Sequence, residues 1–436
     1  MTPLVDGQAT FAAMLDAIRA AQGYVYIAGW ALTPAFALDP GTADGLLTAV
    51  LAEVAPRVPV KILTWSGSVW LFPPSQRLTA YARAELLRAV PQVDCRLDAR
   101  ARFSHCHHQK TLVVDGQVAF VGGLDLTTLS GNRWDVPGHP LRFGPNWHDV
   151  ALQLEGEVVA DVEANFRQRW AAVTGEHELP HADPRTDPAW QTRCQVVRTI
   201  PRRVYPFAPR GEFSIAHAYL EALEQAKHFI YLENQYIWSP EIVDALIAAM
   251  ERNDDDPCFR VLLVLPARAY MGKYDNDKNV ARLRAVDRGR GRFAAYTLYS
   301  GGAAEGLTGF RFLPVYVHSK VAIVDDAWYT VGSANLNQRG LATDTELNVQ
   351  ALDPAGARTL RLRLWAEHLG LEVADLAERP VVDVIDQEWR ARAAQVAAVV
   401  AQGRGILPAQ VYPYQLGRMP GSWVLQHLEA AIVEGL

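Results

Sequence analysis

The feature that most constrains this fold is an eight-residue pattern that occurs twice. Residues 108–115 read HQKTLVVD and residues 318–325 read HSKVAIVD, so a histidine, a lysine and an aspartate recur at the same spacing. A lone H-x-K carries little information, but each copy here leads to a glycine-containing turn at the same interval, GGLD at 122–125 and GSAN at 332–335. Two copies in matched surroundings indicate a duplicated unit.

The elements around the two patterns also repeat in the same order. Each half opens with an amphipathic helix and an apolar strand, within 11–30 and 215–238. Continuous apolar runs follow at 58–67 and 259–268, as in strands buried on both faces. After each motif, a further strand leads into a helix. This alternation predicts an α/β fold with helices on both faces of mixed sheets.

A polar segment with three prolines, GEHELPHADPRTDPAWQ, separates the halves. We therefore divide the chain into residues 1–188, with the first motif, and residues 189–436, with the second. A C-terminal extension from about residue 376 has no counterpart in the first half.

The motifs themselves suggest chemistry on a phosphodiester. In a strand, residues two apart face the same way, so His108 projects with Lys110 and His318 with Lys320. If an interface between the halves brings them together, the ammonium groups face anionic oxygens and the imidazoles supply attack and proton transfer. Two buried core histidines are the alternative, which the matched surroundings of the two copies disfavour.

The motif aspartates are expected to be structural. Asp115 lies at an odd interval from the lysine and begins an Asp-Gly hairpin turn, and Asp325 occupies the matching position. The neighbouring His105, Cys106 and His107 alternate between two faces of a strand, so we expect no metal site there.

Charge and hydropathy limit the classes of partner that the protein can bind. Forty-two basic against 48 acidic residues give a net charge of −6, which disfavours binding to nucleic acid. No apolar run reaches the roughly 18 residues needed to cross a bilayer, and the first 20 residues do not read as a signal peptide. We expect a cytoplasmic or peripheral membrane protein, secreted only if a leader has been removed.

Taken together, HHQKTLVVDG, NWHDVALQLEG, IYLENQYI and VHSKVAIVDDAWYTVGSANLNQRG resemble the phospholipase D superfamily, and most of all the true phospholipases D. The resemblance spans nearly the whole chain. It implies a duplicated α-β-α sandwich, with two similar halves whose mixed sheets pack around one shared active site, and it implies no cofactor and no metal.

The resemblance also implies residue roles. His108 would be the nucleophile and His318 the general acid/base. The other expected catalytic residues are Lys110, Lys320, Asp149 and Glu346. The expected substrate-binding residues are Asn335, Ser333, Gly123 and Asp125. Asp125 stands where the family motif has asparagine, which puts phosphate binding by that residue in question.

The expected activity is hydrolysis of phosphatidylcholine-like diesters to phosphatidic acid through a phosphohistidine, with transfer to alcohols. The alternatives are a phosphatidyltransferase, such as a cardiolipin or phosphatidylserine synthase, and a nuclease. The expected partners are a phospholipid at a membrane or micelle surface and alcohol acceptors, without nucleic acid, for a monomeric enzyme. Aromatic residues at 65–74 and 205–207 are candidates for lipid contact or for core packing.

Overall fold

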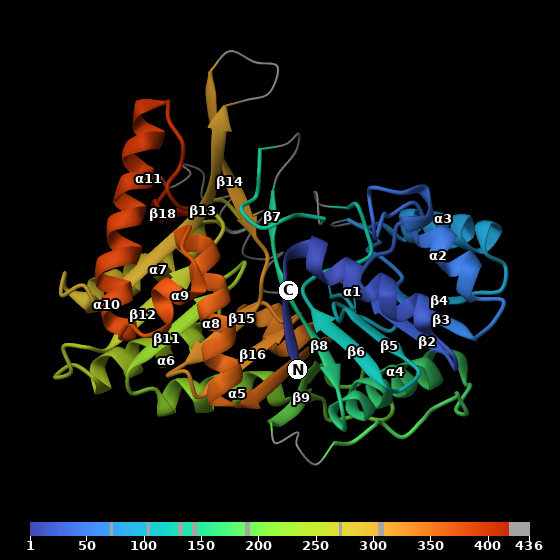
Figure 1. The fold of residues 1–436 in the computed structure, drawn as a ribbon. Coiled ribbons are helices and arrows are strands. Elements are labelled where there is room, and N and C mark those ends of the chain that lie inside the picture. The colour runs from blue at the N-terminus through green and yellow to red at the C-terminus, as the bar shows by residue number, and fades with distance from the viewer. Residues whose placement is uncertain are drawn as a thin grey trace.

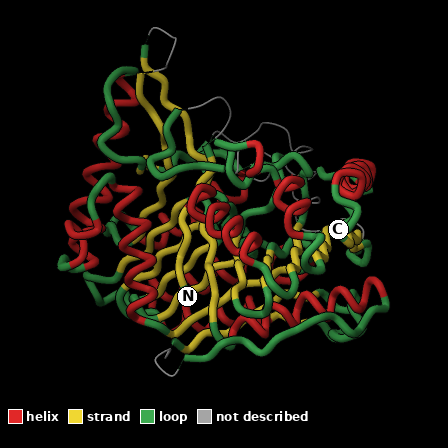
Figure 2. Tube along the Cα trace, turned by 45° about the vertical axis from the view of Figure 1, so that its right-hand side comes forward, coloured by secondary structure: helices red, strands yellow, loops and turns green. Residues whose placement is uncertain are grey.

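The strands of this computed structural model form two mixed sheets (Figures 1 and 2). The structure describes residues 1–69, 73–102, 105–129, 134–141, 146–187, 192–269, 273–303 and 309–417. Among these residues, the first sheet has seven strands in the order β1 (Thr2–Val5), β8 (Val150–Glu155), β6 (Val118–Gly122), β5 (Thr111–Val114), β2 (Val25–Gly29), β3 (Val60–Trp65) and β4 (Asp94–Asp98).

The second sheet has eleven strands in the same described part of the chain. Their order is β10 (Glu212–Phe213), β9 (Arg193–Ile200), β17 (Glu346–Leu352), β16 (Trp328–Gly332), β15 (Val321–Val324), β11 (Phe229–Glu233), β12 (Arg260–Val264), β13 (Phe293–Ala303), β14 (Phe310–Val317) and β7 (Trp147–His148). Strand β18 (Val411–Pro413) pairs with β13, which extends with β14 beyond the rest of the sheet (Figure 1).

Six consecutive strands have the same arrangement in both sheets. The order β8-β6-β5-β2-β3-β4 in the first corresponds to β17-β16-β15-β11-β12-β13 in the second. Within these six, β2, β3 and β4 run parallel in the first sheet, and β11, β12 and β13 run parallel in the second. The remaining neighbouring pairs of the six are antiparallel in both sheets. The predicted duplicated α/β architecture is confirmed. The predicted boundary at residue 188 lies outside the described residues.

Successive residues of a strand face opposite sides of the sheet, so buried strands present apolar side chains on both faces. Helices cover both faces of each sheet and bury these side chains. Tyr24 and Tyr26 of the β2 region belong to the core between the sheets, whereas Val25 and Ile27 belong to the outer core of the first half. The outer helices of the first sheet are α1 (Asp6–Ala20), α2 (Leu47–Val54) and α3 (Gln76–Ala89), with the short η1 (Ala43–Gly45) before α2. Those of the second sheet are α5 (Ser214–Gln225), α6 (Pro240–Arg252) and α7 (Lys273–Asp287).

The middle layer combines helices from both halves with the C-terminal extension. It contains α4 (Val158–Thr174), α8 (Pro354–Leu369), α9 (Val373–Ala377), η3 (Val384–Trp389) and α11 (Arg390–Gln402), with the short α10 (Val381–Asp383) before η3. Trp389 packs against Trp365 with ring centroids 5.5 Å apart, so the extension completes the central core. None of the helices in the described ranges is long and apolar enough to cross a bilayer.

Candidate active site

Two backbone pairings between the halves bring the motifs together. Strand β7 of the first half pairs in parallel with β14 of the second (Figure 1), and the His318 N–H donates to the His148 carbonyl at 2.8 Å. Reciprocally, the His108 N–H donates to the Thr345 carbonyl at 2.9 Å. Each motif histidine is therefore held by the opposite half. The motif histidines and lysines lie just before β5 and β15, and the expectation that they lie within strands is wrong.

The imidazoles pair with carboxylates across the same interface. His108 Nδ1 lies 2.9 Å from Glu346 Oε1, and His318 Nδ1 lies 2.7 Å from Asp149 Oδ2. Each imidazole thus pairs with a carboxylate of the other half. Both carboxylates are buried, and His318 is buried beside Trp147, with ring centroids 4.6 Å apart.

These contacts define which ring nitrogen carries the proton. A carboxylate facing Nδ1 accepts a hydrogen bond from the Nδ1–H tautomer, which places the lone pair of a neutral imidazole on Nε2. Burial raises the pKa of Glu346 well above its usual range, an effect opposed by Lys110 and by the hydrogen bond from Ser333. In its ionised form this carboxylate accepts the hydrogen bond from His108 Nδ1–H.

The turns after the two motifs support the carboxylates in different ways. The Ser333 hydroxyl donates to Glu346 Oε2 and accepts from the Leu347 N–H at 3.1 Å. At the matching position, Gly123 has no side chain, and a Cβ there would lie 2.2 Å from Asp149 Oδ1. Ser333 and Gly123, both expected to bind substrate, are placed against the carboxylates that orient the histidines.

The two lysines have unequal surroundings. Lys110 Nζ lies 3.1 Å from Asp125 Oδ2 and donates to the His108 carbonyl at 2.6 Å. Asp125 Oδ1 also accepts from the Trp30 N–H at 2.8 Å, so this carboxylate balances a buried ammonium and ties β2 to the site. In the second half, Lys320 donates to the His318 carbonyl and the matching residue is the neutral Asn335.

The motif aspartates lie away from the histidines. Asp115 directly follows β5 and lies beside the start of β2, and Asp325 directly follows β15 and lies beside the start of β11. Asp115 accepts from the N–H groups of Gln22, Gly23 and Tyr24 at 2.7–2.8 Å. Asp325 accepts from three consecutive N–H groups, those of residues 227–229, at 2.7–2.8 Å. Each aspartate therefore joins its hairpin turn to the strand that neighbours the motif strand.

One cavity of about 500 Å³ contains both histidines. Asn335 lines it, with its side-chain oxygen buried. Four aromatic side chains that sequence reasoning did not assign to the site also line it: Trp30, Trp147, Tyr236 and Trp238. Aromatic residues near strands are ordinarily core residues, so their residue type did not indicate a role in the site. The only available signal was their position in segments next to the motif strands.

A carboxylate in β11 joins the two halves behind the site. Glu233 accepts from His148 Nε2 at 3.0 Å, from the Ser319 hydroxyl at 2.7 Å and from His368 Nε2 at 2.8 Å. Burial alone would raise the pKa of Glu233, but the two histidines hold it well below its usual range. An acidic residue inside the apolar run HFIYLENQYIW was the available signal for this contact, and sequence reasoning did not use it.

Among the described residues, two groups of side chains, all buried except the partly exposed Glu367, have a donor set that would suit a metal ion. They are Asp6, His139, His148 and Glu367, and the group His148, Glu233 and His368. The two ring nitrogens of His148 already face Asp6 and Glu233 at 3.0 Å each, so an ion in either group would compete with one of these contacts. His107, part of the cluster considered from the sequence, instead contacts Asp98 at 3.0 Å.

The segments considered for lipid contact separate into two cases. Trp65 is buried, while Trp70, Leu71 and Phe72 lie outside the described residues. Tyr205 is buried and stacks on the partly buried Phe207, whereas Pro206 is exposed, so the two aromatic rings of this segment pack against the protein.

Comparison with known proteins finds similarity to a PLD-like family profile and to phospholipases D. A family profile described as "Cardiolipin synthase, PLD-like domain" matches residues 219–365. Phospholipase D A of Dictyostelium discoideum is 26% identical over 84% of this chain, and phospholipase D alpha 1 of Cynara cardunculus is 25% identical over 84%. The chain spans 35% and 64% of these relatives, less than two thirds of either.

A solved structure shares the fold. The phosphatidylserine synthase of Haemophilus influenzae superimposes with a TM-score of 0.56, covering 91% of this chain and 94% of that one. Its sequence identity is 13%, so the likeness concerns the arrangement of helices and strands.

Proposed function

Since this chain belongs to the phospholipase D superfamily, we propose that it is a phospholipase D that hydrolyses the distal phosphodiester bond of phosphatidylcholine-like lipids. The products are phosphatidic acid and the free head-group alcohol. One observation carries the proposal: the two motif histidines line a single cavity, and each is oriented at Nδ1 by a carboxylate of the opposite half.

In the first step, neutral His108 attacks phosphorus through Nε2. The bond from phosphorus to the head-group oxygen breaks, and protonated His318 donates its Nε2 proton to the leaving oxygen. Glu346 stabilises the positive charge that develops on His108 because it accepts the Nδ1 hydrogen bond. The result is a phosphatidyl group on His108 and a neutral His318.

In the second step, His318 removes a proton from an incoming water, whose oxygen attacks phosphorus and releases His108. Lys110, Lys320 and Asn335 are the proposed contacts of the nonbridging oxygens, where negative charge builds up. Asp125 is assigned to balancing Lys110 rather than to binding phosphate, because its carboxylate would repel an anion. No step requires a metal ion.

The covalent intermediate makes alcohols competitors of water. A small primary alcohol that enters the space vacated by the head group would be deprotonated by His318 and would form a phosphatidyl alcohol. The substrate is expected at a membrane or micelle surface, and the enzyme is expected to act as a monomer without nucleic acid.

The test is to incubate the pure protein with mixed micelles of single phospholipids and to identify the products by mass, with and without 1-butanol. We expect phosphatidic acid, replaced progressively by phosphatidylbutanol as the alcohol concentration rises. The matched variants His108→Ala and His318→Ala should each abolish turnover, and the double variant should be little worse. A wild-type protein that forms neither product from any phospholipid contradicts the proposal, and covalent phosphate on His318 reverses the two roles.

A further inference from the structure

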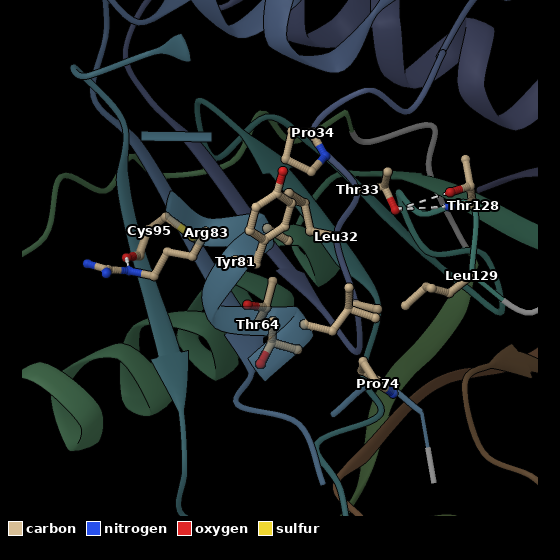
Figure 3. A pocket seen from close by; sticks show the side chains of 14 residues that line it. Leu32, Thr33, Pro34, Thr64, Pro74, Tyr81, Arg83, Cys95, Thr128 and Leu129 are labelled. Atoms are coloured by element: carbon tan, nitrogen blue, oxygen red, sulfur yellow. Dashed lines mark hydrogen bonds between the residues drawn. The ribbon is translucent and has the colours of Figure 1, made fainter. Parts of the chain in front are cut away.

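A second cavity, of about 200 Å³, lies beside the first in the N-terminal half. Its walls come from the segment after β2, from helix α3, from the end of β3, from the start of β4 and from residues 128–129 (Figure 3). Leu32, Thr64 and Tyr81 surround the centre of the view, and the guanidinium of Arg83 points away from it (Figure 3). Tyr81 is 62% exposed and Leu78 39%, so these two side chains form an open mouth.

Two polar side chains in this wall, Thr79 and Arg83, are paired with backbone carbonyls. The Thr79 hydroxyl donates to the Ser66 carbonyl, and Arg83 Nε donates to the Cys95 carbonyl at 2.6 Å. Burial raises the pKa of the Cys95 thiol to about 12, so this side chain stays neutral in the wall. A polar ligand would find few partners here, whereas an apolar one would lose nothing by leaving water.

The second cavity adjoins the one that contains the histidines. Leu129 lines both cavities. Trp30 and Pro73 line the first, and the residues that directly follow them in the chain, Ala31 and Pro74, line the second. The two cavities therefore adjoin at these residues, and a ligand that spanned both would have its polar part between the histidines and an apolar part in the second cavity.

We propose that the second cavity binds one acyl chain of the phospholipid whose phosphodiester lies between His108 and His318. This inference rests on the proposed function and adds to it the place of the chain and the residues that sense its length. The occupant follows from the position of the second cavity beside the first, because an acyl chain of the reacting phosphatidyl group is the apolar part of the substrate that suits a largely apolar wall.

The experiment compares phosphatidylcholines with four- to eight-carbon acyl chains as monomers, below their critical micelle concentrations. In the wild type, kcat/KM should rise with each methylene that enters the cavity, by up to about fourfold. Ala82→Phe, which fills the cavity from α3, should reduce the ratio of kcat/KM between eight- and four-carbon substrates by about tenfold or more. Ala84→Phe, on an exposed position of the same helix that does not line the cavity, should keep the wild-type ratio.

Leu78→Asp, at the exposed mouth, is a second variant that adds no bulk inside, and it should lower the same ratio. Melting temperatures establish that the variants are folded. If the wild type releases choline with no dependence on chain length, or if Ala82→Phe and Leu78→Asp both keep its ratio, the chain site is wrong and the proposed function stands. If the wild type cleaves bis(4-nitrophenyl) phosphate but releases choline from no chain length, the proposed function is wrong and the chain site with it.

Discussion

The most specific prediction concerns Gly123, which matches Ser333 in the second half. Because serine is accepted at position 333, exchange of the glycine for serine would look conservative from the sequence. The structure predicts otherwise, since a Cβ at position 123 would lie 2.2 Å from Asp149 Oδ1. Real Cβ contacts are essentially never shorter than 3.0 Å, so something must shift by at least 0.8 Å, and we expect the Asp149 carboxylate to withdraw because it is the end of a side chain whereas position 123 is backbone.

A withdrawal of this size is incompatible with the 2.7 Å contact between Asp149 Oδ2 and His318 Nδ1. A hydrogen bond to a charged group contributes about 1.5–3 kcal/mol. If the transition state depends on this bond, kcat for Gly123→Ser should fall by about 10- to 150-fold, at 1.36 kcal/mol per factor of ten. The assay is steady-state release of the head-group alcohol from a phospholipid, with the melting temperature measured alongside.

Two controls separate this mechanism from general damage. Gly302→Ser places the same side chain in β13, where nothing lies within 4 Å of a Cβ, and it should keep wild-type kcat. Gly123→Ser combined with Asp149→Ala should be no slower than Asp149→Ala alone, because the carboxylate through which the serine acts is absent. Wild-type kcat in a folded Gly123→Ser protein, or full additivity in the double variant, would refute the reasoning.

Four further outcomes are expected. The pKa of Glu233 is depressed in the folded protein, so its ionised carboxylate stabilises the fold above the ordinary pKa of 4.5. This contribution is lost as the pH falls through the lower pKa of the folded state. Urea titrations should therefore show that the loss of unfolding free energy in Glu233→Gln, clear at pH 5–6.5, shrinks below pH 4.5. Asp115→Ala and Asp325→Ala each leave three N–H groups without a carboxylate and should lower the free energy of unfolding by about 2–4 kcal/mol, and an unchanged urea midpoint would count against this. Asp125→Asn removes the charge that balances Lys110, so competitive inhibition by inorganic phosphate should strengthen about tenfold, as read from the inhibition constant. Dialysis against EDTA should leave kcat/KM unchanged, and loss of activity that one divalent ion restores would contradict the proposed chemistry.

The sequence by itself determined the duplication, the α/β class and the identity of the histidines, lysines and carboxylates to be examined. These features can be read from the chain because they depend on local periodicity and on a repeated spacing. The Asp-Gly turn at 115–116 is an example, since both residues adopt the positive φ that such a turn requires.

The pairing of those residues was decided only by the tertiary structure. Asp149 and Glu346 follow their own motifs in the chain, yet His318 contacts Asp149 across 169 positions and His108 contacts Glu346 across 238. The reason is physical: β7 pairs with β14, and the segment before β5 pairs with the one before β17, so each half supplies the carboxylate that the other half's histidine needs. Local periodicity carries no information about which strands pair. Asp149 lies beside Gly123 only because β6 and β8 are neighbours in the first sheet, and there the absence of a side chain at position 123 leaves room for the carboxylate.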